Sequence, residues 1–207
     1  MEQILLLGSK SQARRQLLDE AKISYELVNC AADESKCEWA TSLRETVDRI
    51  ALYKMEHVVL PQGKKEGEVC YVLTADTLGQ SADGTLQGKP TDRYDAIEKI
   101  KSARGGASVG TSFCLDKRQY KNGKWELLER IQEFVTASYD FHVPDEWIDI
   151  YLEKSLGLQG SGAIAIEGYG TQFLCSVQGS YSAIVGLPMF ELRCALGKLG
   201  FFEGILG

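Results

Sequence analysis

The sequence lacks the marks of several large classes of protein. Basic residues are not in excess, because 23 Lys and Arg residues stand against 29 Asp and Glu residues and give a net charge of −6. Proteins that coat duplex nucleic acid depend on basic contacts to phosphate, so no nucleic-acid partner is expected. No apolar stretch approaches the ~20 residues that cross a bilayer, so no membrane association is expected. The net charge does not exclude a small anionic ligand, but binding one would require a local basic cluster or a cation.

Histidine is scarce, and cysteine is scattered. The two histidines, His57 and His142, stand apart from the six cysteines, none of which forms a Cys-x-x-Cys pair. Zinc-finger spacing is therefore absent, and no Ser-His-Asp triad can be assembled from spacing. The first residues carry no basic segment and too short an apolar run for a secretion signal. We expect a cytoplasmic protein with inert, buried thiols; metal or redox use of the thiols is the alternative.

What is present predicts one domain, residues 1–207, with a mixed α/β fold. A chain of 207 residues that is 44% hydrophobic can bury a sizeable core. Strands and helices do not alternate strictly, which favours a mixed sheet. Short apolar runs predict strands at 4–7, 25–28, 69–75, 107–115, 125–143 (one or two strands) and 171–177. Amphipathic periodicity predicts helices at 13–21, 41–60, 92–103 (with Tyr94, Ile97 and Ile100 apolar), 145–154 and 189–199, and loops include 29–35 and 116–124.

The stretch from Val72 to Pro90 carries the clearest local signal. An apolar run leads to one carboxylate, Asp76, and after Asp83-Gly84 the chain returns one ammonium, Lys89. Asp-Gly between short apolar segments predicts a hairpin, which would bring Asp76 and Lys89 near each other at one end of a sheet. Such a pair can bind a metal and a phosphate, or it can be only a salt bridge.

A second candidate site follows the first predicted strand. Ser9 and Ser11 precede a helix whose first turn carries Arg14 and Arg15. A helix N-terminus presents free N–H groups and a positive dipole, which suit phosphate. Two arginines there oppose the dipole, which indicates an anionic ligand, with solvated surface arginines as the alternative.

No complete phosphate-binding motif is present. The segment from Gly84 to Pro90 is too short for a Walker A loop, and proline has no hydroxyl for a metal. What remains is a set of acids and cations suited to phosphoryl chemistry, in which acids hold Mg²⁺ and activate water while cations bind polyphosphate. A generic set of salt bridges is the alternative. The set comprises Ser9, Ser11, Arg14, Arg15, Glu34, Lys54, Asp76 and Lys89, with Glu167 in a glycine-rich segment.

These residues, taken in order and spacing, resemble the Maf family of nucleotide pyrophosphatases. Each matching segment is short, but together they run from near the start of the chain to near its end. The matching segments are Ser9-Lys10-Ser11 with Arg14-Arg15, Asp33-Glu34-Ser35, Arg49-Ile50-Ala51-Leu52-Tyr53-Lys54, Ala75-Asp76-Thr77, Gly88-Lys89-Pro90, Glu167-Gly168-Tyr169-Gly170 and Gly179 to Pro188.

The resemblance implies a twisted mixed sheet with flanking helices in two lobes around a cleft, similar to inosine-triphosphate pyrophosphatases, in a homodimer. It implies a metal-dependent hydrolase that cleaves a nucleoside triphosphate, standard or modified, between the α and β phosphates. Asp76 would activate water, and Glu34 with Asp76 would hold Mg²⁺ or Mn²⁺. The remaining residues would contact the substrate: Lys54 and Lys89 with catalytic roles, and Ser9, Ser11, Arg14 and Arg15 for binding.

Base choice in this family is associated with three positions, which here are Ala13, Thr77 and Glu167. The dTTP/UTP branch typically has Arg, Thr and Gln there, and the 7-methyl-GTP branch has Trp, Gln and Glu, so this chain fits neither. The Glu167 carboxylate only accepts hydrogen bonds, which favours a base edge with N–H groups, such as guanine, over dTTP. A solvated loop residue is the alternative. Gly160 stands where a lysine is often found.

The sequence leaves two alternative functions open. A non-catalytic nucleotide-binding regulator of cell division would agree with the division inhibition attributed to the family and with the unusual Gln12-Ala13. The retained Asp76, Lys89 and Lys54 argue against it. A structural protein would need all of these polar residues to be surface pairs.

Overall fold

The computed structural model describes residues 3–40 and 42–203, and the chain divides into two compact units. Unit 1 contains residues 1–76, 112–134 and 189–207, and unit 2 contains residues 77–111 and 135–188. The three long strands β5 (Val69–Ser81), β7 (Ala107–Lys121) and β8 (Lys124–Phe141) each contribute residues to both units. Each unit is described by itself below.

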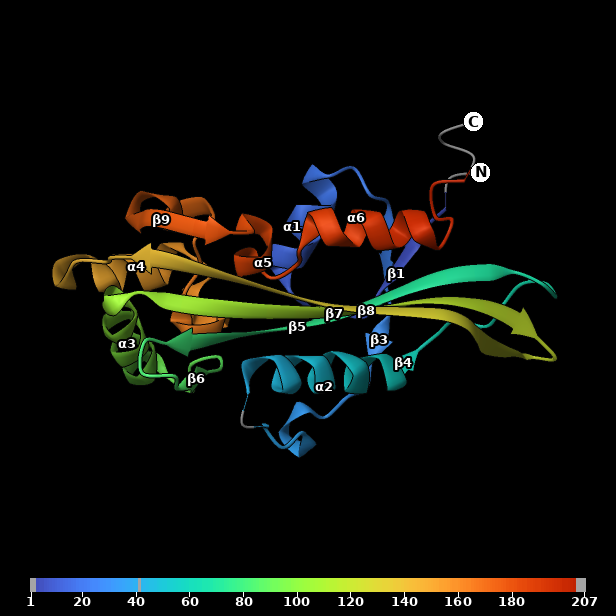
Figure 1. Ribbon diagram of the computed structural model, residues 1–207, viewed down its shortest axis with the longest axis horizontal. Helices are drawn as coiled ribbons and strands as arrows, with labels where there is room; N and C mark the ends of the chain where they lie inside the picture. Colours follow the sequence, from blue (N-terminus) through green and yellow to red (C-terminus); the bar gives the residue numbers. More distant parts are fainter. Residues whose placement is uncertain (1–2, 41, 204–207) are drawn as a thin grey trace. The chain divides into compact units, whose positions relative to one another are not determined.

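The remaining helices and strands belong to one unit or the other (Figure 1). Unit 1 contains β1 (Leu5–Leu7), α1 (Gln12–Glu20), β2 (Tyr25–Leu27), β3 (Asn29–Cys30), α2 (Leu43–Glu56), β4 (Val58–Val59) and α6 (Met189–Lys198). Unit 2 contains β6 (Leu86–Gln87), α3 (Arg93–Ser102), α4 (Ile148–Lys154), β9 (Leu174–Gly179) and α5 (Tyr181–Val185).

The sheet is mixed, as predicted. Hydrogen bonding gives the strand order β2-β1-β5-β7-β8-β9, with β6 on β5, while β3 and β4 form a separate antiparallel pair. Strand β1 runs parallel to both of its neighbours, with Leu5 opposite Tyr25 on one side and Tyr71 on the other. The β5–β6 and β8–β9 pairs are antiparallel.

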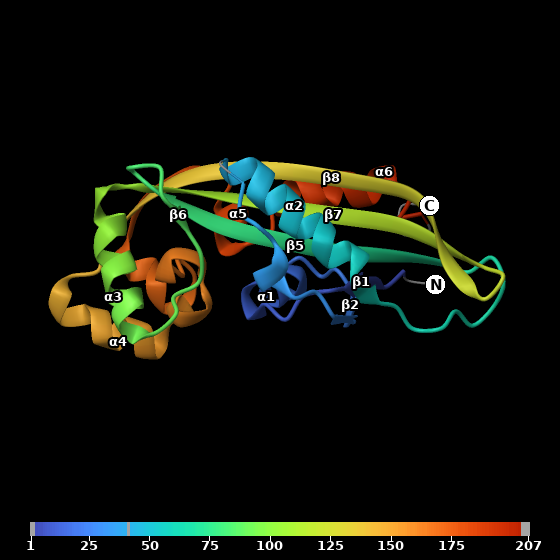
Figure 2. The same ribbon diagram turned by 90° about the horizontal axis from the view of Figure 1, so that it is seen from below.

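Unit 1 buries its strands between helices. The apolar run of β1 is buried along its whole length, as expected for a parallel strand covered on both faces. Figures 1 and 2 show α2 along one face of the unit-1 strands and α6 along the other. Helix α2 begins where the Ser42 side chain accepts from the Glu45 N–H at 3.2 Å. Its buried residues Val47, Ile50 and Lys54 recur at helical spacing, so a charged side chain shares the inner face with apolar ones.

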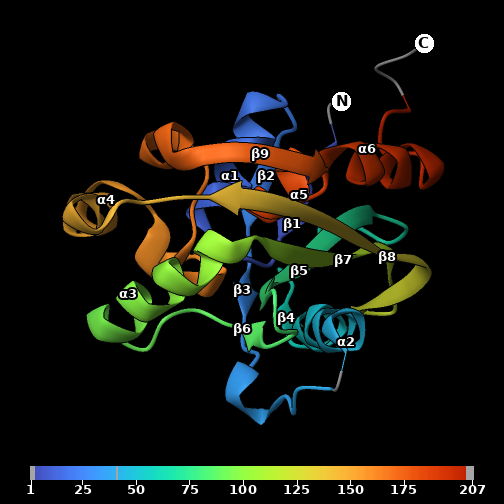
Figure 3. The same cartoon turned by 60° about the vertical axis from the view of Figure 1, so that its left-hand side comes forward.

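Unit 2 has its own apolar core beneath α3 and α4, which lie next to each other on one side of its strands (Figures 2 and 3). Helix α3 begins after Asp92, whose carboxylate accepts from the Asp95 N–H at 2.8 Å. In α4, the hydroxyl of the fully buried Tyr151 accepts from the Ala165 N–H at 2.7 Å and donates to the Ala163 carbonyl at 3.2 Å. Helix α4 therefore fixes the backbone that leads to Glu167.

The Asp83-Gly84 hairpin is confirmed. Gly79 of β5 lies opposite Gln87 of β6 in an antiparallel pairing. The Gly84 N–H donates to the Ser81 carbonyl at 2.9 Å, and Gly84 adopts a φ of +89°, which glycine reaches without a Cβ clash. The turn chemistry alone was sufficient to place this reversal.

Several predicted boundaries were wrong where a distant partner decides the structure. The helix predicted for 41–60 begins at Leu43 and ends at Glu56, and Val58–Val59 forms β4; residue 41 lies outside the described residues. Strand β4 pairs with Asn29–Cys30, inside the predicted loop 29–35, whose end forms the 3₁₀ turn Glu34–Lys36. The β-branched valines thus satisfy a strand partner rather than extend the helix.

Other predicted boundaries were wrong in segments rich in charged or small residues. The predicted loop 116–124 is strand as far as Lys121, and only the turn at Asn122-Gly123 is a loop. The strand predicted for 171–177 begins at Leu174, after the 3₁₀ turn Gly168–Phe173. Helix 145–154 opens as a 3₁₀ turn, Asp145–Trp147. Tyr94 is 74% exposed and is not an apolar position of α3.

The cysteines are all free, and two of them fit the inert thiols that were predicted. Cys70 and Cys114 are buried, and burial raises the pKa of each thiol to about 12. Cys175 is exposed, so burial is not general. Within residues 3–40 and 42–203, no helix has both the length and the apolar character needed to cross a membrane.

Asp116 is a fully buried carboxylate in β7 that is held by two arginines. Arg118 donates to Oδ2 from Nε at 2.9 Å and from Nη2 at 2.6 Å. Arg130 of β8 donates to Oδ1 from Nε at 2.6 Å and to Oδ2 from Nη2 at 2.8 Å. Four charge-assisted hydrogen bonds offset the cost of burying this charge.

We predict that Asp116→Ala lowers the free energy of unfolding by about 3 kcal/mol, at the lower end of the range for breaking a buried pair because both arginines keep some contact with water. Urea unfolding followed by circular dichroism measures this loss. The matched control is Asp149→Ala, which removes the exposed partner of Arg93 at 2.6 Å and is expected to cost less than about 1 kcal/mol. Equal losses for the two variants would contradict the prediction.

Candidate active site

Asp76 lies at the centre of a polar cluster in unit 1. It follows a run of buried residues in β5 and is only 6% exposed. Lys54 Nζ donates to Asp76 Oδ1 at 2.7 Å. The ion pair that sequence analysis considered for Asp76 involved Lys89, but the lysine that pairs with it is Lys54, which is 22 residues away along the chain.

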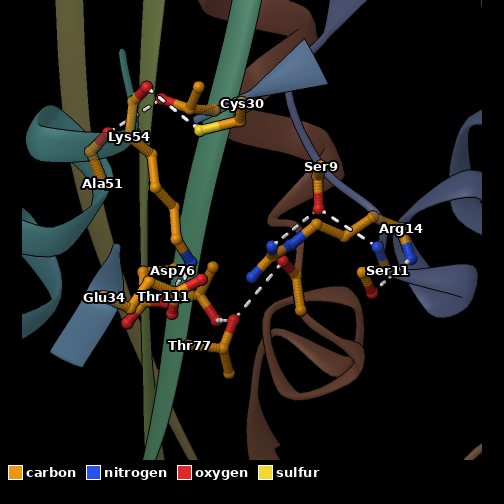
Figure 4. A network of polar contacts seen from close by, with 12 residues as sticks. Ser9, Ser11, Arg14, Cys30, Glu34, Ala51, Lys54, Asp76, Thr77 and Thr111 are labelled. Atoms are coloured by element: carbon orange, nitrogen blue, oxygen red, sulfur yellow. Dashed lines mark hydrogen bonds and ion pairs between the residues drawn. The ribbon is translucent and has the colours of Figure 1, made fainter. Parts of the chain in front are cut away.

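Glu34 joins the cluster through the same ammonium. Lys54 Nζ lies 3.1 Å from Glu34 Oε2, and Figure 4 shows the Lys54 side chain reaching both carboxylates. The 3₁₀ turn that carries Glu34 is capped by Asp33, whose Oδ1 accepts from the Ser35 N–H at 3.3 Å and its hydroxyl at 2.7 Å. The acidic Asp33-Glu34-Ser35 segment is therefore a local turn that presents one carboxylate to Lys54 and uses the other for capping.

Two hydrogen bonds hold Lys54 in place. The Thr74 hydroxyl of β5 donates to the carbonyl of Ala51 at 2.8 Å, which fixes α2 against the strand that carries Asp76. The Cys30 thiol lies 3.4 Å from the Lys54 carbonyl and donates to it. The other buried residues of α2 are mainly apolar and pack this helix against the core, so α2 holds the Lys54 ammonium in a fixed position.

The first loop brings Ser9, Ser11 and Arg14 together (Figure 4). The Ser11 hydroxyl accepts from the Arg14 N–H at 3.3 Å and begins α1. Arg14 Nη1 donates to the Ser9 hydroxyl at 3.1 Å, and its guanidinium is buried. Burial lowers the pKa of Arg14, while the charges of Asp76 and Glu34 raise it. Arg14 is therefore not a solvated surface arginine, whereas Arg15 is half-buried and Ala13 lies beside them on α1.

Burial controls the acidity of Asp76. Burial raises the pKa of its carboxyl above the ordinary value of 3.8, and the neighbouring Glu34 charge raises it further, while Lys54 and Arg14 lower it. Oδ2 of Asp76 is buried without a hydrogen-bond partner in the described part of the chain. A buried polar atom without a partner is costly, so this oxygen is a place for a ligand, a proton or a cation.

The cluster fits a divalent cation that is partly coordinated by substrate. Asp76 and Glu34 offer carboxylate oxygens, which Mg²⁺ and Mn²⁺ prefer. The described residues contain no group of three or more His, Cys, Asp or Glu side chains that could hold a metal ion. Mg²⁺ commonly uses one or two carboxylates together with substrate phosphates and water, so two acids meet the need.

The other predicted site residues lie in unit 2. Lys89 follows β6 and is exposed. Glu167 follows a run of buried residues, and burial raises the pKa of its carboxyl. Gly160 is packed so closely that a Cβ there would lie 2.2 Å from the Ile164 carbonyl oxygen. A lysine at position 160 is therefore incompatible with this backbone.

Sequence analysis missed the residue that holds Thr77. The Thr77 and Thr111 hydroxyl oxygens are 2.8 Å apart, and Thr111 donates its proton to the Ala183 carbonyl at 2.7 Å. Because a hydroxyl has one proton, Thr77 is the donor to Thr111. The signal was a hydroxyl within the buried run Val109 to Leu115, where an unpaired polar group would be costly. Ser161 was missed as well; its hydroxyl accepts from the Gly79 N–H at 2.9 Å and donates to the Gln87 carbonyl.

The chain is thus a mixed α/β protein with a buried carboxylate that lies near a lysine, an arginine and a second acid. The family model for Maf-like proteins matches residues 4–199. The chain belongs to the Maf family.

Relatives match over nearly the whole chain. A protein named nucleoside triphosphate pyrophosphatase from Prochlorococcus marinus is 32% identical, with 95% of this chain and 98% of the relative covered. A dTTP/UTP pyrophosphatase from Caldicellulosiruptor bescii is 30% identical, with 95% of each chain covered. In a structural comparison, a HAM1 protein from Coxiella burnetii matches with a TM-score of 0.34 and 9% identity, over 67% of this chain and 73% of that chain.

We predict that the pKa of the Asp76 carboxyl lies above its ordinary value of 3.8 and that Lys54→Met raises this pKa further. The sign follows because burial disfavours the carboxylate, while the Lys54 charge and hydrogen bond favour it. A ¹³C-carboxyl NMR titration of aspartate-labelled protein, assigned with Asp76→Asn, measures the midpoint. Lys99→Met, which removes the partner of Asp95 at 2.5 Å, is the control and should leave the Asp76 midpoint unchanged. A lower midpoint in Lys54→Met would contradict the assignment.

Proposed function

We propose that the protein is a metal-dependent nucleoside triphosphate pyrophosphatase that yields a nucleoside monophosphate and pyrophosphate. The observation that carries the proposal is the buried Asp76 carboxylate, with one oxygen paired to Lys54 and the other without a partner in the described residues. The pyrophosphatase names of relatives at about 30% identity over nearly the whole chain support the same reaction.

Asp76 is the proton acceptor in the proposed reaction. A water oxygen bonds to the α phosphorus while the bond from that phosphorus to the bridging oxygen breaks, and pyrophosphate leaves with the bridging oxygen. The proton of the water passes to the Asp76 carboxylate, whose pKa is raised by burial, and a higher pKa makes a carboxylate a stronger proton acceptor. Placing this group in a buried site also keeps bulk water from competing for it.

Cations neutralise the charge that moves to the departing pyrophosphate. We assign Lys54, Lys89 and Arg14 to the phosphates, with Arg15 and the hydroxyls of Ser9 and Ser11 completing the phosphate contacts. Asp76 and Glu34 would hold Mg²⁺ or Mn²⁺, which polarises phosphoryl oxygens when bound. The capped start of α1 supports the phosphate assignment, because helix N-termini bind anions.

The base is assigned through Glu167. The relative from Caldicellulosiruptor bescii is named for dTTP and UTP, whereas the one from Prochlorococcus marinus is named for nucleoside triphosphates in general. An ionised Glu167 only accepts hydrogen bonds and therefore favours a base edge with N–H donors, such as guanine. We propose that Thr77, held by Thr111, and Ala13 complete the selection of the base.

A nucleotide panel tests the reaction. With Mg²⁺ or Mn²⁺ and dTTP, UTP, GTP, CTP, ATP or 7-methyl-GTP, at least one nucleotide should release pyrophosphate, and EDTA should abolish release. Asp76→Asn should lower kcat by about 10²–10⁴-fold through loss of the general base. Lys89→Ala should lower it by about 10²–10³-fold through loss of charge stabilisation.

The control for the lysine is Lys101→Ala, which removes an exposed α3 lysine and should keep activity. Thermal unfolding checks that each variant is folded. Nucleotide binding by calorimetry without any product from the panel would contradict the enzyme and favour a binding regulator.

Glu167→Gln tests the base assignment. A glutamine both donates and accepts, so we expect the ratio of kcat/KM for UTP over GTP to rise by about tenfold, the size of one lost or gained hydrogen bond. Steady-state pyrophosphate release with both substrates measures the ratio. Gln172→Glu, at an exposed position, is the control for a change of charge in the same segment. An unchanged ratio would place Glu167 outside the base site.

A further inference from the structure

Lys54 serves two carboxylates with one ammonium. Its Nζ lies 2.7 Å from Asp76 Oδ1 and 3.1 Å from Glu34 Oε2 (Figure 4). The lysine and the aspartate are buried, so solvent screens their attraction only weakly. A single positive charge therefore bridges the two acids that would otherwise repel each other.

These two carboxylates are also the metal ligands assigned above. A hard divalent cation binds through carboxylate oxygens, and an ammonium uses the same oxygens as hydrogen-bond acceptors. Ammonium and divalent cation therefore cannot both be in contact with Asp76 Oδ1 and Glu34 Oε2 without strong mutual repulsion. The Lys54 ammonium therefore occupies the position beside both carboxylates to which a divalent cation would be attracted.

The net charge of the cluster opposes the binding of a divalent cation while Lys54 stays in place. When both acids are ionised, Asp76 and Glu34 contribute two negative charges, and Lys54 and the buried Arg14 contribute two positive ones. The nucleotide-free cluster is thus neutral. A divalent cation added beside an unmoved Lys54 would leave an excess of two positive charges in a cluster in which Arg14, Lys54 and Asp76 are buried.

The ammonium does not fully satisfy the site. Asp76 Oδ2 stays buried without a hydrogen-bond partner in the described residues, although Oδ1 is paired. The Lys54 ammonium donates a hydrogen bond to Asp76 Oδ1 and none to Asp76 Oδ2. A cation that carries water ligands can serve the second oxygen, which gives it an advantage that offsets the loss of the lysine contact.

We propose that Lys54 is an internal cation that competes with the divalent metal for Asp76 and Glu34 and is released from them when the metal binds. The released ammonium then becomes available to a phosphate, so the metal and the nucleotide are bound cooperatively. This inference rests on the proposed function for the identity of the cation, but the competition is a property of binding and needs no turnover.

Mn²⁺ binding to nucleotide-free protein tests the competition. The free Mn²⁺ signal in electron paramagnetic resonance gives Kd for wild type, Lys54→Met and Lys54→Gln. We expect both variants to bind Mn²⁺ about tenfold or more tightly than wild type, or about 1.4 kcal/mol. Lys54→Arg keeps the charge and should remain within about threefold of wild type. Lys99→Met removes the partly buried lysine of the Asp95 pair and should leave Kd unchanged.

A second measurement needs no loss of the lysine. The Lys54 ammonium, assigned by its loss in Lys54→Arg, should give a slowly exchanging ¹⁵N NMR signal in the metal-free protein that disappears or shifts on saturation with Mg²⁺. Unchanged or weaker Mn²⁺ binding in Lys54→Met and Lys54→Gln would overturn the proposal, as would an unaltered ammonium signal or no Mn²⁺ binding to any nucleotide-free variant. Pyrophosphate release by wild type is scored separately, so turnover without competition would leave the function standing and remove only this inference.

Discussion

The ion pair between Lys54 and Asp76 is the constraint on which the candidate site depends. Two charges are taken out of water, and their attraction offsets that cost only when the geometry is good and further partners are present. Glu34 supplies one such partner, and the buried Arg14 supplies a second positive charge that lowers the pKa of Asp76. The strand β5, the helix α2 and the turn at Glu34 must therefore meet with ångström accuracy. The Thr74 bond to the Ala51 carbonyl is one device that secures this meeting.

Unit 1 contains two buried aspartates in strands, and their surroundings differ in an informative way. Asp116 receives four hydrogen bonds from two arginines, so both of its oxygens are satisfied. Asp76 has one paired oxygen and one without a partner among the described residues. A carboxylate that is fully saturated can only stabilise the fold. A carboxylate left partly unsatisfied can exchange partners, which is what proton transfer and cation binding both require.

The sequence was most informative where local chemistry decides the structure. The Asp83-Gly84 turn and the apolar run of β1 predicted their elements closely, because turn preferences and short apolar runs depend on only a few residues. It was least informative where the partner is distant. Strand β4 ends helix α2 early because its partner strand is near residue 30, and two of the four hydrogen bonds to the buried Asp116 come from Arg130, 14 residues further on.

The candidate site shows the same division. The sequence patterns singled out both Asp76 and Lys54 as candidates, but the hairpin suggested Lys89 as the ion-pair partner of Asp76. The actual partner is on a helix, and pattern reasoning does not reveal which helix face meets which strand. Thr111 escaped notice because a threonine in a strand is ordinary, and only its bonds to Thr77 and the Ala183 carbonyl give it a role.

Gly160 gives the Glu167 segment a different kind of constraint. The Ile164 carbonyl oxygen occupies the space of a Cβ at position 160, and the Ala165 carbonyl oxygen would lie 1.8 Å from a Cβ at Gly170. The segment is thus folded back on two glycines that leave no room for any side chain. A side chain at either glycine would therefore require a different path of the main chain on that side of Glu167, so the position of Glu167 depends on two residues that have no side chain.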